Sequence, residues 1–178
     1  MTINELIEKD RTFTQSSFIA KVDNTFIMLL SSIMMKDIDR VKHKINDNIY
    51  NLYKIHIDEL IKNNEIQMYD ELNVKSTEIL NITETDTKYV IEVLLVSRYM
   101  DYVIDGTTRQ YKRGINTQRI EKNNYLTFEK IKDAKQQGVI KKCPGCGASI
   151  DFNNTGVCEY CHTSYNTQDY DWILTNIK

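Results

Sequence analysis

The four cysteines of this chain fall in one short stretch, "CPGCGASIDFNNTGVCEYC". Cys143 and Cys146 form one C-x-x-C pair, and Cys158 and Cys161 form a second. Two such pairs allow two tight turns to present four thiolates to one metal ion at the corners of a tetrahedron. The spacing therefore predicts a single metal site held by four sulfur atoms.

The chemistry of the site favours zinc. Gly145 and Gly147 relax the first turn, so that backbone N–H groups can point at sulfur. Soft thiolates select zinc over hard cations, although an iron site of the rubredoxin type stays open as an alternative. The second turn, "CEYC", lacks the proline and glycine that rubredoxin-type sites usually repeat. Because four cysteines leave no coordination position for substrate, we expect one structural zinc.

Other uses of the cysteines fit less well. Two disulfides would need an oxidising compartment, and the N-terminus "MTINELIEKDR" lacks the features of a signal peptide. A redox C-x-x-C would not need a second pair beside it. His162 adjoins Cys161, but four sulfurs already complete the shell, so we interpret it as an exposed polar residue. Residues 138–178 hold slightly more acidic than basic side chains, which argues against nucleic-acid binding.

Composition suits one globular domain with a small appendix. The chain has 178 residues, of which 41% are hydrophobic and 27% charged, with a formal net charge of −2. Its most apolar run, Phe26 to Met35, is about half the roughly 20 residues that a membrane helix needs. We therefore expect a core helix there, no transmembrane segment in this chain, and a cytoplasmic location.

The elements that must position the cysteines change type along the chain. Apolar residues at three- and four-residue steps predict helices over 13–34 and 45–62, with a short helix over 36–42 between them. Thr14 or Ser16 is expected to cap the first. Alternation and β-favouring residues then predict strands at 66–82, 89–105, 118–131 and 169–177.

Details of these strands can be predicted as well. The first strand is expected to carry a bulge near Ser76. In the strand 89–105, apolar residues occupy both odd-numbered and even-numbered positions. This pattern suits a central strand covered on both faces. The stretch 106–114, "GTTRQYKRG", is expected to turn the chain.

Helices followed by strands indicate an α+β fold, with helices packed on one face of an antiparallel sheet. The expected domain comprises residues 1–138 and 166–178, with a zinc ribbon inserted at 139–165. A connection of about 35 residues without structure would be unusual, and metal binding would stabilise it.

Several stretches resemble the Tim44-like domain family, named for the membrane-tethering subunit of the mitochondrial import motor. They are "DRTFTQSSFIAKVDNTFIMLLSSIMMKDIDRVKHKINDNIYNLY", "ELNVKSTEIL", "DYVID", "LTFEKIK" and "YDWILTNIK". The cysteine block lies between the last two, where bacterial members with an inserted zinc ribbon are expected to carry it. The resemblance spans nearly the whole chain and implies the curved, cone-shaped fold of nuclear-transport-factor-two-like proteins.

The resemblance implies a non-enzymatic binding or adaptor domain, linked to protein transport or to a membrane-associated partner. Members of the family are associated with membranes, so a peripheral membrane location and a protein or lipid partner are expected. The implied apolar pocket would be walled by aromatic side chains, and each of these would serve equally well in a plain core. The residues expected at this pocket are Phe26, Tyr53, Phe128 and Trp172.

An enzyme is the alternative, because the cone fold also hosts isomerases and dehydratases. Such a site needs an acid or phenol inside the cone. Asp101 with Tyr99 or Tyr102 would qualify, as would His56, although a semi-buried structural histidine suits the helical spacing of His56 better.

A basic stripe is the last candidate site. Lys36, Arg40 and Lys44 follow one another at four-residue steps, so a continuous helix would align them on one face. Such a stripe suits anionic lipid or an acidic partner. The alternative is a solvated face with local ion pairs, because Asp37 and Asp39 intervene.

Overall fold

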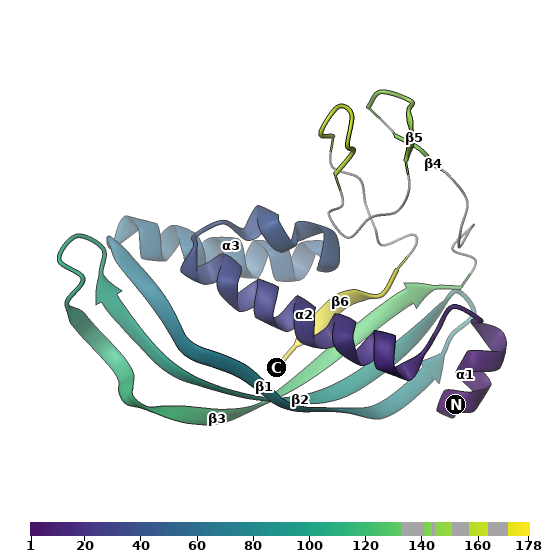
Figure 1. The fold of residues 1–178 in the computed structure, drawn as a ribbon, viewed down its shortest axis with the longest axis horizontal. Coiled ribbons are helices and arrows are strands. Elements are labelled where there is room, and N and C mark those ends of the chain that lie inside the picture. The colour runs from purple at the N-terminus through teal and green to yellow at the C-terminus, as the bar shows by residue number, and fades with distance from the viewer. Residues whose placement is uncertain (133–140, 144, 151–156, 164–170) are drawn as a thin grey trace.

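The computed structural model describes residues 1–132, 141–143, 145–150, 157–163 and 171–178. A strongly bowed antiparallel sheet, in the order β1-β2-β3-β6, holds the two long helices on its concave side (Figure 1). The helices are α1 (Ile3–Lys9), α2 (Gln15–Met34), the 3₁₀ helix η1 (Ile38–Lys44) and α3 (Asp47–Lys62). The sheet contains β1 (Glu65–Glu84), β2 (Lys88–Asp105), β3 (Tyr111–Ile131) and β6 (Ile173–Ile177), and the pair β4 (Lys141–Lys142) and β5 (Ser149–Ile150) stands apart. The predicted α+β fold is confirmed.

The helix α1 was missing from the sequence prediction. Thr2 caps it, since the Thr2 hydroxyl accepts a hydrogen bond from the Glu5 N–H and the Glu5 carboxylate accepts one from the Thr2 N–H. This reciprocal capping box satisfies two backbone donors that a helix start leaves free. The T-x-x-E signal was present in the sequence and marks the start of α1.

The helix α2 begins at Gln15, two residues after the predicted start, and its cap is Thr14, one of the two predicted caps, whose hydroxyl accepts from the Ser17 N–H at 3.3 Å. It is long and apolar enough to cross a membrane by length and composition alone, a test that core helices also pass. Here it lies along the concave side of the sheet (Figure 1). Its buried residues are Phe18, Val22, Thr25, Phe26, Leu29, Leu30, Ser32 and Ile33.

The short helix predicted at 36–42 is displaced and has a different geometry. Lys36 takes a left-handed φ of 56°, and the Asp37 N–H returns to the Ser32 carbonyl at 2.9 Å, which terminates α2. The 3₁₀ helix η1 follows, burying Ile38 and Val41. Residues three apart lie on the same face of a 3₁₀ helix, so Ile38 and Val41 can both point into the core.

The strand β1 is bulged at three places against β2, including the predicted position between Val74 and Ser76. The sequence prediction that β2 is covered on both sides is wrong. Among the described residues, helices lie on one face, which buries Ile91, Val93 and Leu95. The apolar side chains on the other face are only half-buried. Neighbouring side chains of the sheet cover them in part, but no described helix packs on that face.

The strand β3 begins at Tyr111, so half of the predicted turn at 106–114 belongs to the sheet. The polar stretch had no apolar alternation to reveal it. Gly114 pairs with Tyr102 at φ 102°, and a Cβ there would lie 2.4 Å from the Asp101 carbonyl oxygen. Glycine is therefore needed for the close approach of the two strands.

The last strand is joined to the core from both sides. β6 pairs with β3 through residues such as Leu174, opposite Phe128. The Asn46 N–H donates to the Leu174 carbonyl at 3.0 Å, and the Asn46 amide donates to the Thr175 carbonyl at 3.1 Å. Asn46 also caps α3, so one side chain fixes this helix against the final strand.

Candidate functional site

The cysteine pairs meet as the sequence predicted. Cys143 Sγ lies 3.5 Å from Cys161 Sγ, and Cys146 Sγ lies 3.8 Å from Cys158 Sγ. All four sulfurs lie within 4.8 Å of one another, and all four cysteines are free. A tetrahedron with a metal–sulfur distance of about 2.3 Å has edges of roughly 3.8 Å, so these separations suit a bound zinc. They are far too long for disulfides.

Two matching turns build the site. The Gly147 N–H donates to the Cys143 carbonyl at 2.9 Å, and the His162 N–H donates to the Cys158 carbonyl at 3.0 Å. Gly147 and His162, each directly after the second cysteine of its pair, both have positive φ, at 74° and 59°. His162 is exposed and its backbone closes the turn, in agreement with its expected role outside the metal shell.

The turns are packed against one another through Gly145 and Thr163. The Gly145 N–H donates to Cys143 Sγ at 3.3 Å, as expected for this turn. A Cβ on Gly145 would lie 2.3 Å from Thr163 Oγ1 and 3.2 Å from Thr163 Cγ2. Thr163 Oγ1 in turn lies 3.1 Å from Cys161 Sγ. The absent side chain of Gly145 therefore leaves room for Thr163 of the second turn, whose hydroxyl contacts Cys161 Sγ of that same turn.

The sulfur cluster already favours a thiolate at one position. The hydrogen bonds with Thr163 lower the pKa of the Cys161 thiol to about 6. At Cys146 the Ala148 N–H lowers the pKa, but burial and the neighbouring thiols outweigh it and raise the pKa to about 11. Crowded thiols cannot all ionise without a compensating cation, and a divalent metal ion supplies that charge.

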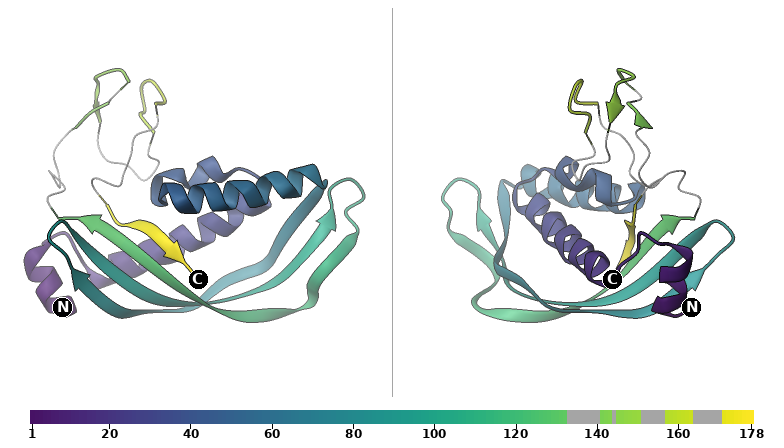
Figure 2. Two further views of the ribbon diagram at one scale, coloured as in Figure 1. Left: turned by 180° about the vertical axis from the view of Figure 1, so that it is seen from behind. Right: turned by 45° about the vertical axis from the view of Figure 1, so that its right-hand side comes forward.

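The site lies away from the sheet. Figure 2 shows β4, β5 and the second cysteine turn beyond the end of β3. The predicted boundaries of the inserted ribbon, at 138/139 and 165/166, lie outside the described residues. The start predicted for the last strand, at 169, lies there too, and β6 is observed from Ile173.

The four residues of the predicted aromatic pocket lie in or against the main core. Phe26, Phe128 and Trp172 are buried members of the main core, and Tyr53 packs against that core. The Phe18 ring explains why, since its centroid lies 5.1 Å from Trp172 and 5.7 Å from Phe128 in edge-on contacts. Phe18, Trp172 and Phe128 therefore pack together as core, and ligand binding at the predicted residues stays a prediction.

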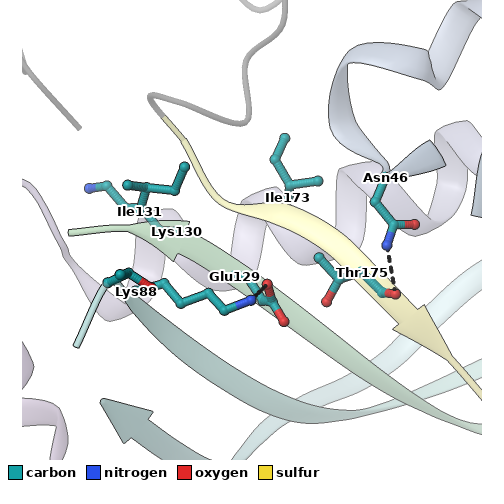
Figure 3. Close-up of a pocket in the computed structure, with 8 residues that line it drawn as sticks. Asn46, Lys88, Glu129, Lys130, Ile131, Ile173 and Thr175 are labelled. Atoms are coloured by element: carbon teal, nitrogen blue, oxygen red, sulfur yellow. Dashed lines mark hydrogen bonds and ion pairs between the residues drawn. The ribbon is translucent and has the colours of Figure 1, made fainter. Parts of the chain in front are cut away.

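A groove of about 390 Å³ lies instead beside the last strand. Figure 3 shows it between β3 and β6, with the ion pair of Lys88 Nζ and Glu129 Oε2, 2.5 Å apart, on one wall. Its lining residues are Asn46, Thr87, Lys88, Glu129, Lys130, Ile131, Ile173 and Thr175. Sequence reasoning missed this groove, because its residues come from separate elements and carry no common motif.

The acid–phenol candidates divide between the two faces of the sheet. Asp101 is the register partner of Tyr69, and Tyr99 lies two residues before Asp101, so these three side chains share the concave face. Tyr102 lies on the opposite face and donates to Asp70 Oδ2 at 3.1 Å. His56 is half-buried on α3. Of the predicted pairs, Asp101 with Tyr99 is the one that faces inward.

Burial changes the acidity of the inward phenols. It raises the pKa of Tyr99 to about 12, helped by the negative charge of Asp101 and by Tyr53. Burial also raises the pKa of Tyr69, again with a contribution from Asp101. Both phenols therefore stay protonated at neutral pH, and neither is poised to act as a base.

The predicted basic stripe does not form as one helical face. Lys36 precedes η1, and Arg40 and Lys44 lie four residues apart in a 3₁₀ helix, which has three residues per turn. Arg40 is exposed, whereas Lys44 is half-buried. Burial, together with the nearby Lys21, lowers the pKa of Lys44. The α-helical spacing that motivated the stripe is therefore wrong, and binding of an anionic partner by these residues stays a prediction.

Residues 1–138 match the Tim44-like domain family, and the protein therefore belongs to that family. Tim44-like domains are generally non-catalytic binding domains. No curated protein matches the chain. Among solved structures, the intermembrane space region of the chloroplast protein ARC6 is similar with a TM-score of 0.47 and 8% identity, covering 100% of this chain and 95% of that chain.

Proposed function

We propose that this protein is a non-enzymatic binding domain whose four cysteines hold one structural zinc. The observation that carries the proposal is the Tim44-like match over residues 1–138, because domains of this family generally bind rather than catalyse. The four-sulfur cluster supports the zinc, since its separations suit a tetrahedral ion and its four ligands leave no open position. The zinc would fasten the connection between β3 and β6.

The proposed partner is a protein or lipid at a membrane surface, reached from the cytoplasm. The outer side of α3 supports this part of the proposal. Leu52 and Ile55 are 60% and 61% exposed and lie three residues apart, so their side chains are neighbours on the helix. The opposite side of α3 already packs on the core through Ile49, Ile57 and Leu60. The exposed pair offers an apolar contact to a partner.

Metal analysis tests the zinc. Protein purified without added metal should contain about one equivalent of zinc, because one four-sulfur site holds one ion. Elemental analysis measures the metal, and mass spectrometry of the alkylated protein counts the free thiols. Iron in place of zinc, no metal, or two disulfides would each reject the structural zinc.

Vesicle flotation and site-specific crosslinking test the binding role. A photoreactive residue at position 52 should form adducts with a lipid or protein in membrane-containing cell fractions, whereas one at Leu80 should not. Leu80 is a matched control, since it is also apolar and 49% exposed but lies on β1. Replacing Ile55 with Ser should weaken both the adduct and flotation with vesicles. Equal labelling from positions 52 and 80, insensitive to Ile55→Ser, would contradict docking through α3.

A further inference from the structure

Three tyrosines and one aspartate gather on the concave side of the sheet, below α3. Tyr69 and Asp101 are register partners on β1 and β2, and Tyr99 shares their face. The rings of Tyr69 and Tyr99 are edge-on, with centroids 5.3 Å apart. Tyr53 comes from α3, and after burial and the charge of Asp101 it makes a further contribution that raises the pKa of both phenols. We call these four residues the phenol cluster.

The charge of the phenol cluster is uncompensated. Among the described residues, no lysine, arginine or histidine nitrogen lies within ion-pair distance of Asp101. Its Oδ1 accepts one hydrogen bond, from the Gln67 side-chain amide at 2.7 Å. Asp101 is half-buried, and a partly desolvated carboxylate gains more from a cation than an exposed one does.

The three hydroxyls are also available. Elsewhere in the chain, the hydroxyls of Tyr50, Tyr102 and Tyr111 donate to oxygens at 2.7, 3.1 and 2.7 Å. The hydroxyls of Tyr53, Tyr69 and Tyr99 make no hydrogen bond to any part of the chain that the structure describes. Tyr99 is only 2% exposed, and a buried phenol usually has a partner. The hydroxyl oxygens of these three phenols therefore stay available to a hydrogen-bonding ligand.

We propose that the phenol cluster binds an organic ammonium group, carried by a small amine or by a lipid head group. A carboxylate, phenol oxygens and the negative faces of aromatic rings all attract such a cation. An anion would meet the charge of Asp101 without a nearby compensating base. This inference rests on the proposed binding role and names the chemistry of one ligand, but it does not depend on the zinc.

Titration with ethanolamine hydrochloride and choline chloride tests the proposal in the whole chain. Ring-labelled tyrosines are followed by NMR at constant ionic strength, with sodium chloride as the reference cation. The expected result is saturable shifts of the Tyr53, Tyr69 and Tyr99 signals, with affinity in the millimolar range of about 1–10 mM. Choline has no N–H donor, so equal binding of both probes would assign the attraction to charge and ring faces.

Two variants decide whether Asp101 carries the binding. Asp101→Asn should weaken the affinity about tenfold, because it removes the negative charge but keeps the shape. Asp70→Asn is the matched control, since Asp70 also contacts a phenol, Tyr102, on the opposite face of the same two strands. It should leave the titration unchanged. Unchanged circular dichroism in both variants excludes a loss of fold.

Vesicles separate the two sources of the ammonium group. Phosphatidylcholine or phosphatidylethanolamine vesicles that shift the phenol-cluster signals would assign a lipid head group, and shifts with the free amines alone would assign a small molecule. No saturable shift up to about 50 mM with either probe, or equal affinity in Asp101→Asn, would overturn the inference. In that case docking through Leu52 would still be tested by crosslinking, and the zinc content by elemental analysis.

Discussion

Lys130 and Asp10 form an ion pair inside the protein, with Lys130 Nζ 2.5 Å from Asp10 Oδ2 and the side chains only 5% and 3% exposed. Asp10 ends α1, and Lys130 lies near the end of β3. Thr12 adds hydrogen bonds to both charges, at 2.6 Å to Asp10 Oδ1 and 3.2 Å to Lys130 Nζ. The pair fixes the N-terminal segment to the sheet.

Lys130→Met is therefore expected to destabilise the protein by about 3–5 kcal/mol, since it leaves a buried carboxylate without its cation. Urea unfolding followed by circular dichroism measures the change. The double variant Asp10→Asn with Lys130→Met should recover part of the loss, because no charge then remains unpaired. A single variant that costs less than about 1 kcal/mol would show that the pair is not buried in solution.

Glu65 gives the fold an acid-sensitive contact. Hydrogen bonds from Arg113, at 2.7 and 2.8 Å, and then from Lys112 lower the pKa of Glu65 to about 2 from its ordinary 4.5. The folded state thus binds the proton more weakly than the unfolded state does. The stabilisation is complete above pH 4.5 and is lost as the pH falls from there towards 2.

Urea midpoints of the wild type should accordingly fall over this pH window, and those of Glu65→Gln should fall less. At pH 7 the substitution should cost roughly 1–3 kcal/mol. Glu71→Gln is the control, because Glu71 is 63% exposed and lies 3.6 Å from Arg119, an exposed pair of little energetic weight. Parallel pH profiles for the wild type and Glu65→Gln would be evidence against the assignment.

Cys146→Ser should release the metal and unfold the cysteine turns while the helices remain. The core that holds α2 and α3 is built from residues of the sheet and helices and includes no cysteine. Circular dichroism and zinc analysis measure the two effects separately. His162→Ala should keep one equivalent of zinc, since the backbone of His162 closes the turn. Complete loss of helical signal in Cys146→Ser would contradict the separation.

Gly145→Ala should weaken zinc binding about tenfold or more, the usual cost of disturbing groups around metal ligands. The new Cβ would lie 2.3 Å from Thr163 Oγ1, so the two turns must move apart. Competition with a chromogenic chelator gives the affinity. Adding Thr163→Ala removes the closest atom, Oγ1, and should restore part of the affinity, although the Thr163 Cβ remains 3.0 Å from the new Cβ. An affinity unchanged by Gly145→Ala would mean that the turns do not pack as described.

The sequence by itself determined the elements whose signals are local. The signals that act through neighbours along the chain are the caps at Thr2 and Thr14, the apolar steps of α2 and α3, and the C-x-x-C spacing of the cysteines. These features depend on hydrogen bonds and side-chain spacing within a few residues. That is why the α+β order and the four-sulfur cluster could be predicted.

The tertiary structure alone decided which side chains meet. Phe18 packs edge-on against both Trp172 and Phe128, which joins three rings from distant parts of the chain in one core. Strand register and alternation placed Tyr69 beside Asp101 and put Tyr102 on the other face. Such contacts join residues far apart in the chain, and their free energy depends on packing and desolvation in the assembled fold rather than on sequence spacing.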